Sequence, residues 1–346
     1  MPALRPPSLH SQRGFSLPEL MIAATIGLII LAGMTTLFVN NTRAQAEVEK
    51  ANRQVENGRF AIQTLSADLR NAGFYAEFDP TVLALPASLP NPCAVTVAAL
   101  KQALPLPVQG IDNAAADALT CLPGLKPGTD VVVVRRTSTC VAGAAGCAPV
   151  SDGGPFFQAS LCDRPTELGS GDSANFYALD ITTATLDRRK RNCNVASAPL
   201  ADVRRFLTYI YYIAGNDRGT DGMPTLKRTE VGSSGAALAT STVSLVNGIE
   251  NLQLEYGLDT SGDGVADVFT AAPADVQAWR QVVSAKVNLL ARNMERTAGH
   301  TDGRKYLLGR DDDGNPVQVG PTGDAYKRHV FQSLVPLPNP AGRRMP

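Results

Sequence analysis

The stretch that decides the fold is Arg13-Gly14-Phe15-Ser16-Leu17-Pro18-Glu19-Leu20, together with the run after it that stays uncharged as far as Thr42. Residues 20–39, LMIAATIGLIILAGMTTLFV, are predominantly apolar. As an α-helix they would extend roughly 30 Å, the thickness of the hydrocarbon core of a bilayer. Arg5 and Arg13 precede the run, and no acidic residue lies before Gly14. The segment therefore predicts one membrane span with its N-terminus inside and its C-terminus outside.

Two common interpretations of such a segment fit it poorly. A secretory signal peptide has a shorter apolar region followed by a small-x-small cleavage site, whereas residues 40–43 read NNTR. A plain signal anchor fits the length of the run but does not explain Glu19. An unpaired carboxylate one turn into a membrane helix costs several kcal/mol. A glutamate is therefore not expected at this position in a segment that serves only as an anchor.

A third interpretation accounts for Glu19, because residues 14–20, GFSLPEL, resemble the processing motif of type IV prepilins. The resemblance implies that a prepilin peptidase cuts after Gly14 and that Phe15 becomes the N-methylated first residue. The apolar segment would then stay in the mature protein and anchor it in the inner membrane. Glu19 would pair with a free N-terminal ammonium, its own or a neighbouring subunit's, and so set the register of assembly.

An amphipathic pattern continues the helix beyond Arg43. Gly73, followed by Asp79-Pro80, is expected to end it, so one helix is predicted from residue 15 to residue 72. The second half has apolar or small residues at alternating spacings of three and four, which form one stripe: Val48, Ala51, Val55, Gly58, Ile62, Leu65, Leu69 and Ala72. The stripe indicates either a coiled-coil seam or packing on a globular head. The head is favoured, because a β-rich region follows whose sheet needs a cover.

Several β-strands are predicted after the helix. The strongest is 203–214, VRRFLTYIYYIA, which is apolar on both faces and should be central in a sheet. Similar patterns predict strands at 129–137, 156–160, 225–231, 251–258, 282–292 and 326–335, and a short helix at 275–281 around Trp279. Region 80–128, rich in Pro, Ala and Leu, is expected to be dominated by loops. Strands joined in succession by turns predict an antiparallel sheet, which with the long helix gives an α+β, pilin-like fold.

The stretch 56–74, ENGRFAIQTLSADLRNAGF, narrows the resemblance to minor pilins of the PilW type. Region 203–335 also resembles that family in its order of strands and turns, whereas the cysteine-bearing region 80–200 resembles it less. The resulting domain organisation is a cleaved leader at 1–14, a transmembrane and filament-core helix at 15–42, and an amphipathic helix at 43–73. A loop-rich, cysteine-bearing part of the head follows at 74–200, and an antiparallel β-sheet part at 201–346.

Six cysteines lie between residues 93 and 193, and none forms a C-x-x-C pair. This distribution argues against a zinc ribbon or a thioredoxin-like site and favours disulfides in an oxidising compartment, here the periplasm. Six cysteines allow fifteen pairings. The expected scheme joins nearest neighbours: Cys93 with Cys121, Cys140 with Cys147, and Cys162 with Cys193.

The loop 259–267, DTSGDGVAD, has the spacing of the first part of a calcium loop. Its candidate oxygen ligands fall at alternate positions, with a glycine at the bend: Asp259, Ser261, Asp263, the carbonyl of Val265, and Asp267. The acidic ligand expected at position 12 is replaced by Thr270. A metal-free polar turn explains the same residues, so both hypotheses stay open. The similar run 311–315, DDDGN, is expected to be a solvated turn.

Composition and motifs argue against several classes of function. The 346 residues carry a formal net charge of zero, so no basic field is available to hold nucleic acid. The three histidines, His10, His300 and His329, have no ligand or catalytic partner at a recognisable spacing. The sequence contains no Walker A, G-x-S-x-G or H-E-x-x-H motif. A structural protein that requires no cofactor is therefore predicted, rather than an enzyme.

The resemblance implies a role in building type IV pili. A minor pilin of this type would join other minor pilins in an inner-membrane complex that primes polymerisation of the major pilin. It would then sit at or near the fibre tip with a large PilY-type tip protein. A type II secretion pseudopilin, with the same anchor and fold, is one alternative. A tip-exposed binding module built on region 80–200 and tuned by calcium is another.

Overall fold

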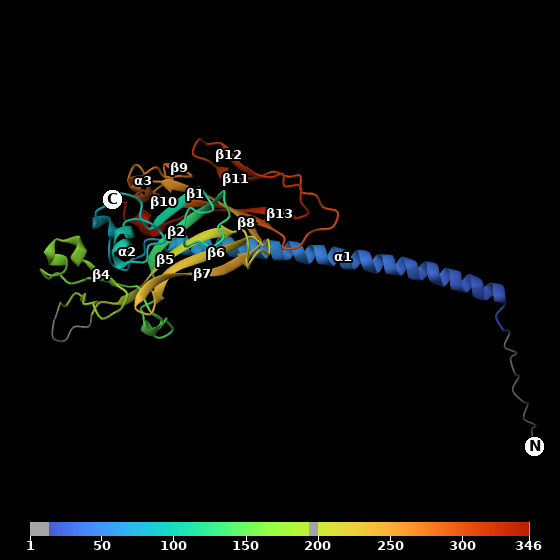
Figure 1. Ribbon diagram of the computed structural model, residues 1–346, viewed down its shortest axis with the longest axis horizontal. Coiled ribbons are helices and arrows are strands. Elements are labelled where there is room, and N and C mark those ends of the chain that lie inside the picture. Colours follow the sequence, from blue (N-terminus) through green and yellow to red (C-terminus); the bar gives the residue numbers. More distant parts are fainter. Residues whose placement is uncertain (1–13, 194–199, 346) are drawn as a thin grey trace, which may run out of the picture. The chain divides into compact units, whose positions relative to one another are not determined.

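The structure, a computed structural model, describes residues 14–193 and 200–345. The chain divides into two units, Met1–Ala51 and Asn52–Pro346. Helix α1, Leu17–Arg70, contributes its first part to the first unit and its last part to the second (Figure 1). The remaining helices and strands that the structure describes belong to the second unit.

Both ends of α1 follow from the sequence. Ser16 stands just before the first helical residue, and its carbonyl accepts the N–H of Leu20 at 3.1 Å. Pro18 lies in the first turn, where its missing N–H breaks no helical hydrogen bond. Gly73 follows the last turn with a φ of +72°, a conformation that glycine adopts without steric cost. The predicted long helix is confirmed, and it is two residues shorter at each end than expected.

The second unit contains two antiparallel sheets and a separate hairpin. The larger sheet has seven strands, ordered β1-β2-β5-β3-β4 with β6 and β7 continuing from β5: β1 Val108–Ala114, β2 Thr129–Thr137, β3 Phe156–Ala159, β4 Tyr177–Asp180, β5 Val203–Ala214, β6 Thr225–Ser234 and β7 Ala237–Asn247. The smaller sheet has four strands in the order β13-β10-β8-β9: β13 Arg328–Pro336, β10 Val282–Arg292, β8 Ile249–Leu258 and β9 Val268–Thr270. The hairpin pairs β11 Tyr306–Arg310 with β12 Pro316–Val319.

Short helices complete the second unit. Three are α-helical: α2 Val97–Ala103, α3 Val276–Arg280 and α4 Pro338–Gly342. Four are single 3-10 turns: Pro80–Val82, Val150–Asp152, Leu168–Ser170 and Ser173–Asn175. Helix α3 begins after Asp275, whose carboxylate accepts the N–H of Ala278 at 2.8 Å and caps the helix. It buries Trp279 against Tyr256 of β8, with ring centroids 4.6 Å apart, so the helix predicted around Trp279 is confirmed.

The largest buried cluster joins the second part of α1 to both sheets. Ala61, Leu65 and Leu69 of α1 are fully buried in it. Strand β8 contributes four alternate residues: Leu252, Leu254, Tyr256 and Leu258. Burial of each such large side chain is worth about 1.5–3 kcal/mol, so this cluster holds the α1 segment after Asn52 on the sheets. Packing on a head is therefore the correct interpretation of the amphipathic stripe.

Strand β5 is central, as its composition predicts. It pairs with β2 on one side, and with β3 and β6 on the other. Ile210, Tyr211, Tyr212 and Ile213 have no exposed surface. Both faces are covered because odd and even residues point into different clusters: Tyr211 and Ile213 join the core under α1, and Ile210 and Tyr212 join a second cluster with β2.

The structure corrects parts of the predicted strand pattern. Loops dominate region 80–128, as expected, but the region also contains α2 and β1, which are not predicted. Strands β4, β7, β9, β11 and β12 are not predicted. Four of them have five residues or fewer, and β7 alternates weakly. In β10 the register shifts between Val282 and Ser284, so Val282 joins the largest cluster together with Ala285 and Val287.

The amphipathic stripe of α1 is also corrected at its N-terminal end. Val48 and Val55 are 60% and 42% exposed. Gln54 is buried instead, and its side-chain amide donates to the carbonyls of Ala291 and Lys327, at 2.7 and 3.0 Å. Position 54 is therefore buried although it is polar, because two backbone carbonyls accept hydrogen bonds from its side chain.

Three disulfides join the cysteines in nearest-neighbour order, which is the scheme expected from the sequence. They link Cys93 to Cys121, Cys140 to Cys147, and Cys162 to Cys193, with Cα–Cα distances of 5.6, 5.8 and 5.1 Å. These distances lie within the usual range for a disulfide. Each bridge therefore closes a local segment of the cysteine-bearing region rather than joining distant parts of the head.

Candidate assembly surfaces

The first turn of α1 holds a carboxylate at the site where the mature chain would begin. Glu19 accepts hydrogen bonds from the backbone N–H and the hydroxyl of Ser16, at 3.3 and 3.1 Å. This is the arrangement of a capping box, in which the residue at the third helical position reaches back to the N-cap. The helix dipole also favours a negative charge there. Since Phe15 adjoins Ser16, the geometry keeps a negative charge near the amine that cleavage after Gly14 would release, while the pairing itself stays a prediction.

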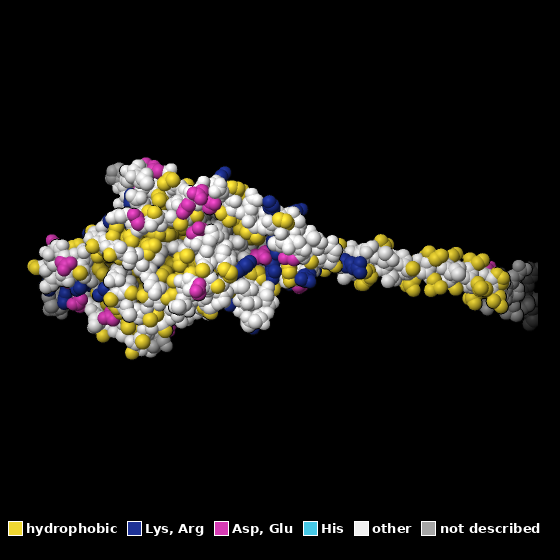
Figure 2. All heavy atoms as spheres, turned by 45° about the horizontal axis from the view of Figure 1, so that its top comes forward, with side chains coloured by type: hydrophobic (Ala, Val, Ile, Leu, Met, Phe, Trp, Pro, Cys, Tyr) yellow, Lys and Arg dark blue, Asp and Glu magenta, His cyan; other side chains and the backbone are white. Residues whose placement is uncertain are grey.

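The N-terminal part of α1 is apolar and unburied. Figure 2 shows hydrophobic side chains along it, and those that are more than half exposed are Leu17, Leu20, Met21, Ile22, Ile26, Leu28, Ile29, Ile30, Leu31, Met34, Leu37 and Phe38. Among the described residues, α1 is the one helix long and apolar enough to cross a membrane. The hydroxyls of Thr25, Thr35 and Thr36 donate to carbonyls of the preceding turn. Their polar groups are thus satisfied inside the helix, as a lipid environment requires.

Polar and close contacts fasten the next part of α1 to the edges of both sheets. The Asn57 amide donates to the carbonyl of Asn247, at the end of β7, at 3.1 Å. Gly58 lies against the ring of Phe331 on β13, where a Cβ would come within 2.1 Å of a ring carbon. A larger residue at 58 would force α1 away from β13, so this glycine permits the close approach of the helix.

A buried arginine anchors the start of β13. Arg328 is 7% exposed and its guanidinium pairs with three carboxylates: Asp324 at 2.6 Å, Glu250 at 2.5 Å and Asp302 at 2.8 Å. The hydrogen bond from Arg328 lowers the pKa of Asp324 well below its usual range. The network ties the segment that precedes β13 to strand β8, and so holds β13 at its position in the sheet.

The loop 259–267 forms a network of hydrogen bonds around two carboxylates. Asp259 is fully buried and accepts the N–H groups of Gly262 and Gly264, at 2.6 and 2.9 Å. It also pairs with the Arg344 guanidinium at 2.6 Å. Burial raises the pKa of Asp259, but the hydrogen bonds from Arg344 and the two glycines outweigh burial and hold the pKa at about 2. Asp267 caps the other side of the loop through the N–H groups of Thr260 and Ser261.

The candidate calcium ligands are therefore divided among different partners. Asp263 accepts the N–H of Val265 at 2.8 Å, while Arg344 supplies the positive charge beside Asp259. Within the described residues, no group of three or more His, Cys, Asp or Glu side chains is placed to hold a metal ion. In this conformation the loop does not fit calcium, because a guanidinium holds its buried carboxylate. Calcium binding stays a prediction that requires Arg344 to move.

The run 311–315 forms the turn between β11 and β12. One of its aspartates, Asp312, also makes hydrogen bonds to another segment of the chain. The Asp312 carboxylate accepts the hydroxyl of Thr270 at 2.5 Å and the N–H groups of Ala271 and Ala272 at 2.8 and 2.9 Å. It therefore fastens the hairpin to the end of β9. Residues 311–315 form an exposed turn, as expected, and the hydrogen bonds of Asp312 add a contact to a segment distant in sequence that the turn pattern does not predict.

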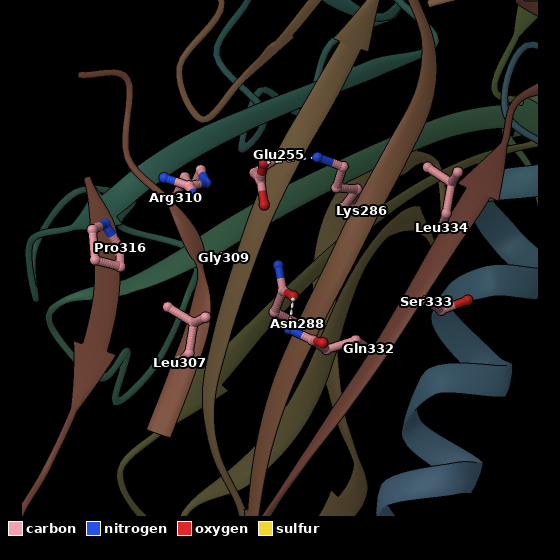
Figure 3. A pocket seen from close by; sticks show the side chains of 10 residues that line it. All are labelled: Glu255, Lys286, Asn288, Leu307, Gly309, Arg310, Pro316, Gln332, Ser333 and Leu334. Atoms are coloured by element: carbon pink, nitrogen blue, oxygen red, sulfur yellow. Dashed lines mark hydrogen bonds and ion pairs between the residues drawn. The ribbon is translucent and has the colours of Figure 1, made fainter. Parts of the chain in front are cut away.

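A groove of about 340 Å³ lies on the outer face of the four-stranded sheet, beside the β11–β12 hairpin. Figure 3 shows Glu255 of β8, Lys286 and Asn288 of β10, and Gln332 and Leu334 of β13 on its floor, with Leu307 and Pro316 on the hairpin. Lys286 pairs with Glu255 at 3.1 Å, and Gln332 donates to Asn288 at 2.8 Å. The sequence patterns do not predict this groove, because the hairpin that forms its wall is itself not predicted.

Comparison with known families matches two parts of the chain. The family described as Type IV Pilus-assembly protein W matches residues 210–339. The family described as Prokaryotic N-terminal methylation motif matches residues 9–35. The first match covers β8, β10 and β13 and the groove between them, and the second covers the capped start of α1. Searches of curated proteins and of solved structures found no match.

Proposed function

We propose that the chain primes pilus assembly and is incorporated at or near the pilus tip, because residues 210–339 match the Type IV Pilus-assembly protein W family and residues 9–35 match the N-terminal methylation motif. The chain is a structural, non-enzymatic minor pilin. Its prepilin-type helix anchors it in the inner membrane before it enters the pilus. The priming step and the position at the tip are the parts of the function that we propose.

The observation that carries the proposal is the capped, unburied helix at the N-terminus. Twelve large apolar side chains between Leu17 and Phe38 are more than half exposed, so this segment needs lipid or other helices around it. Glu19 is the one charge in it, and the capping contact with Ser16 orients its carboxylate toward the N-terminal end. In a complex of prepilins, that carboxylate would select the axial position of a neighbour that offers an N-terminal ammonium.

The size of the head supports a place at the tip rather than along the shaft. The unit Asn52–Pro346 contains two sheets and three disulfides. A head of this size is difficult to repeat closely along a fibre, whereas at an end it meets neighbours on one side. The partners that we propose are other minor pilins, the major pilin below them, and a large PilY-type tip protein, while prepilin peptidase acts on the leader.

Substitution of Glu19 tests the register mechanism. We expect Glu19→Ala to leave cleavage of the leader largely intact and to reduce incorporation into pili, because the charge pairing is lost. Glu49→Ala, an exposed acid of the same helix, is the matched control and should assemble normally. Unchanged piliation in Glu19→Ala cells would contradict the proposal that Glu19 sets the register of assembly.

Two further measurements test processing and position. Mass spectrometry of the mature chain should find a methylated Phe15 at the N-terminus, and any other start would contradict the cleavage site. Gold labelling of the head on intact pili should mark fibre ends, whereas label distributed along the shaft would contradict a tip position. Deletion of the chain should lower the number of pili, which is the result that priming requires.

A type II secretion pseudopilin is the alternative with the same anchor and fold. The match to a family named for type IV pilus assembly favours the pilus. Loss of secretion without loss of pili in a deletion strain would support the alternative.

A further inference from the structure

Strand β13 is an outer strand whose second edge is unpaired. It closes one end of the four-stranded sheet and pairs with β10 from residue 328 to residue 336. Figure 3 shows β13 between β10 and helix α1. Within residues 14–193 and 200–345, no strand bonds its outer edge. An open edge presents a row of backbone donors and acceptors that another extended chain can use.

The pairing register identifies which backbone groups point outward. The N–H of Leu337 donates to Val283, and the N–H of Asn293 donates to Lys327. Hydrogen-bonded pairs alternate along an antiparallel ladder, so the odd-numbered residues of β13 direct their backbone groups toward β10. The even-numbered residues Val330, Gln332 and Leu334 direct theirs to the open edge. These three residues offer a row of three N–H and three C=O groups.

Most of the edge lacks the residues that usually protect an outer strand, and Pro336 stands only at the end of β13. Residues 329–335, HVFQSLV, contain no lysine, acidic residue or proline, although such residues normally block pairing with another chain. Leu334 is 59% exposed. The edge is therefore open to an added strand in both its backbone and its side chains.

Hollows lie on both sides of this edge. On the inner side, a hollow of about 240 Å³ lies between β13 and α1 and is lined by Arg59, Ile62, Gln63, Phe331 and Gln332. On the outer side lies the groove beside the β11–β12 hairpin, with Leu307 and Leu334. Side chains of an added strand would alternate between the two sides, so one hollow would receive its odd residues and the other its even residues.

The charges beside the edge indicate what the added strand carries. Arg59 is the charged residue of the inner hollow, and it has no ion-pair partner among the described residues. In the outer groove Glu255 and Lys286 neutralise each other, which leaves Arg310 as the additional charge. Both sides of the edge are thus net positive and favour an acidic side chain on the incoming strand.

We propose that β13 is a docking edge for an extended, acidic strand of another pilus subunit, which adds to the four-stranded sheet. The proposal rests on the proposed function, because it requires a partner within the pilus complex. A second copy of this chain is disfavoured, since antiparallel pairing about Gln332 would bring two Arg59 side chains together. The backbone of Val330, Gln332 and Leu334 would supply affinity, and the two hollows would supply selectivity.

Crosslinking in cells that assemble pili tests the docking edge. A photo-reactive amino acid is placed at Leu334 of the full-length chain, and the matched control places it at Val243, which is 46% exposed on β7, the outer strand of the other sheet. We expect Leu334 to crosslink to an acidic extended segment of another pilus subunit, identified by mass spectrometry, and Val243 not to do so. A crosslink from Leu334 to a second copy of the chain, to a helix, or to no subunit overturns the proposal.

A proline substitution tests the backbone of the edge directly. Gln332→Pro removes one outward N–H and leaves the backbone hydrogen bonds to β10 in place. Gln332→Ala keeps that N–H, and both variants lose the side-chain hydrogen bond to Asn288. We expect Gln332→Pro to reduce the crosslink roughly five- to tenfold, the range that corresponds to loss of about one net hydrogen bond, and Gln332→Ala to change it little. Equal losses in both variants would assign the contact to the side chain and overturn strand addition.

Piliation separates this proposal from the proposed function. If deletion of the chain abolishes pili but Gln332→Pro restores them and the crosslink as well as the wild type does, the docking edge is wrong and the assembly role stands. If deletion leaves pili unchanged, the priming role fails, and the crosslink then reports on the edge alone.

Discussion

The carboxylate of Asp68 on α1 lies 2.6 Å from the Arg136 guanidinium on β2. The same carboxylate accepts the hydroxyl of Tyr211 on β5. One side chain of the helix is thereby joined to two adjacent strands of the larger sheet, in a region where both charged side chains are largely buried. The contact explains why the second part of α1 packs on the head, although its stripe alone also suits a coiled coil.

Asp68→Asn should destabilise the head measurably. The substitution leaves the Arg136 guanidinium without its counter-charge in a mostly buried site, which should lower the free energy of unfolding by roughly 2–3 kcal/mol. Chemical unfolding of the full-length chain in detergent measures the change. Asp187→Asn is the matched control, because its pair with Arg188 is formed by a 71% exposed carboxylate and should contribute less than about 1 kcal/mol. Equal losses in the two variants would contradict a special role for Asp68.

The stability of the head should fall as the pH rises from about 4 to about 8 through one buried carboxyl. Asp130 of β2 accepts the N–H groups of Asn113 and Leu254, and so joins the two sheets. Burial raises the pKa of Asp130 to about 8, above its value of about 4 in the unfolded chain. Because the folded state holds this proton more tightly, its contribution is complete below pH 4 and is lost as the pH passes through 8.

Asp130→Asn should flatten this dependence, since the amide does not titrate. Unfolding of the full-length chain at pH 5 and at pH 8 gives the comparison. Asp117→Asn, which replaces an exposed acid in the loop after β1, is the control that should retain the wild-type slope. A variant Asp130→Asn with an unchanged slope between pH 5 and pH 8 would assign the titration to other groups.

Calcium, if it binds the loop 259–267, has to compete with Arg344. Arg344→Ala removes the guanidinium from the buried carboxylate of Asp259, so the variant should bind calcium more tightly than the wild type does. Isothermal titration of calcium into both full-length chains measures the difference. The double variant Arg344→Ala and Asp259→Asn should lose the gain. If no heat of binding is observed in any of the three chains, the loop is a metal-free turn.

The three disulfides should contribute unequally to stability. Cys140–Cys147 closes a separation of 7 residues, whereas Cys93–Cys121 and Cys162–Cys193 close separations of 28 and 31. In the chain-entropy account, the stabilisation grows with the logarithm of loop length, so replacing the Cys140–Cys147 pair by serines should cost about 1 kcal/mol less than replacing either other pair. Thermal unfolding of the three double variants gives the order. The reverse order would show that packing around the bridges outweighs loop entropy.

Local signals account for the parts of this protein that can be predicted from its sequence. The apolar run after Glu19, the spacing of three and four in 58–72, and the β-branched runs at 129–137, 203–214 and 282–292 are each contained in one segment. Their period determines the type of element, which is why β2, β5 and β10 have the predicted bounds. The capping of Glu19 on Ser16 is equally local, since it needs three successive residues in helical geometry.

Contacts between distant segments decide the remainder. Gln54 is buried because the carbonyls of Ala291 and Lys327 accept hydrogen bonds from its side-chain amide. Asp312 joins the β11–β12 turn to the end of β9 because its carboxylate accepts the N–H of Ala271. The open edge of β13 follows from its place at the end of the strand order. The periodicity of apolar residues in the sequence does not predict that order. By itself, the sequence determined the long apolar helix, the kinds of strands, and the resemblance to a pilus-assembly family. Tertiary structure alone decided which strand edges and polar groups found partners, because hydrogen bonds are satisfied in space rather than along the chain.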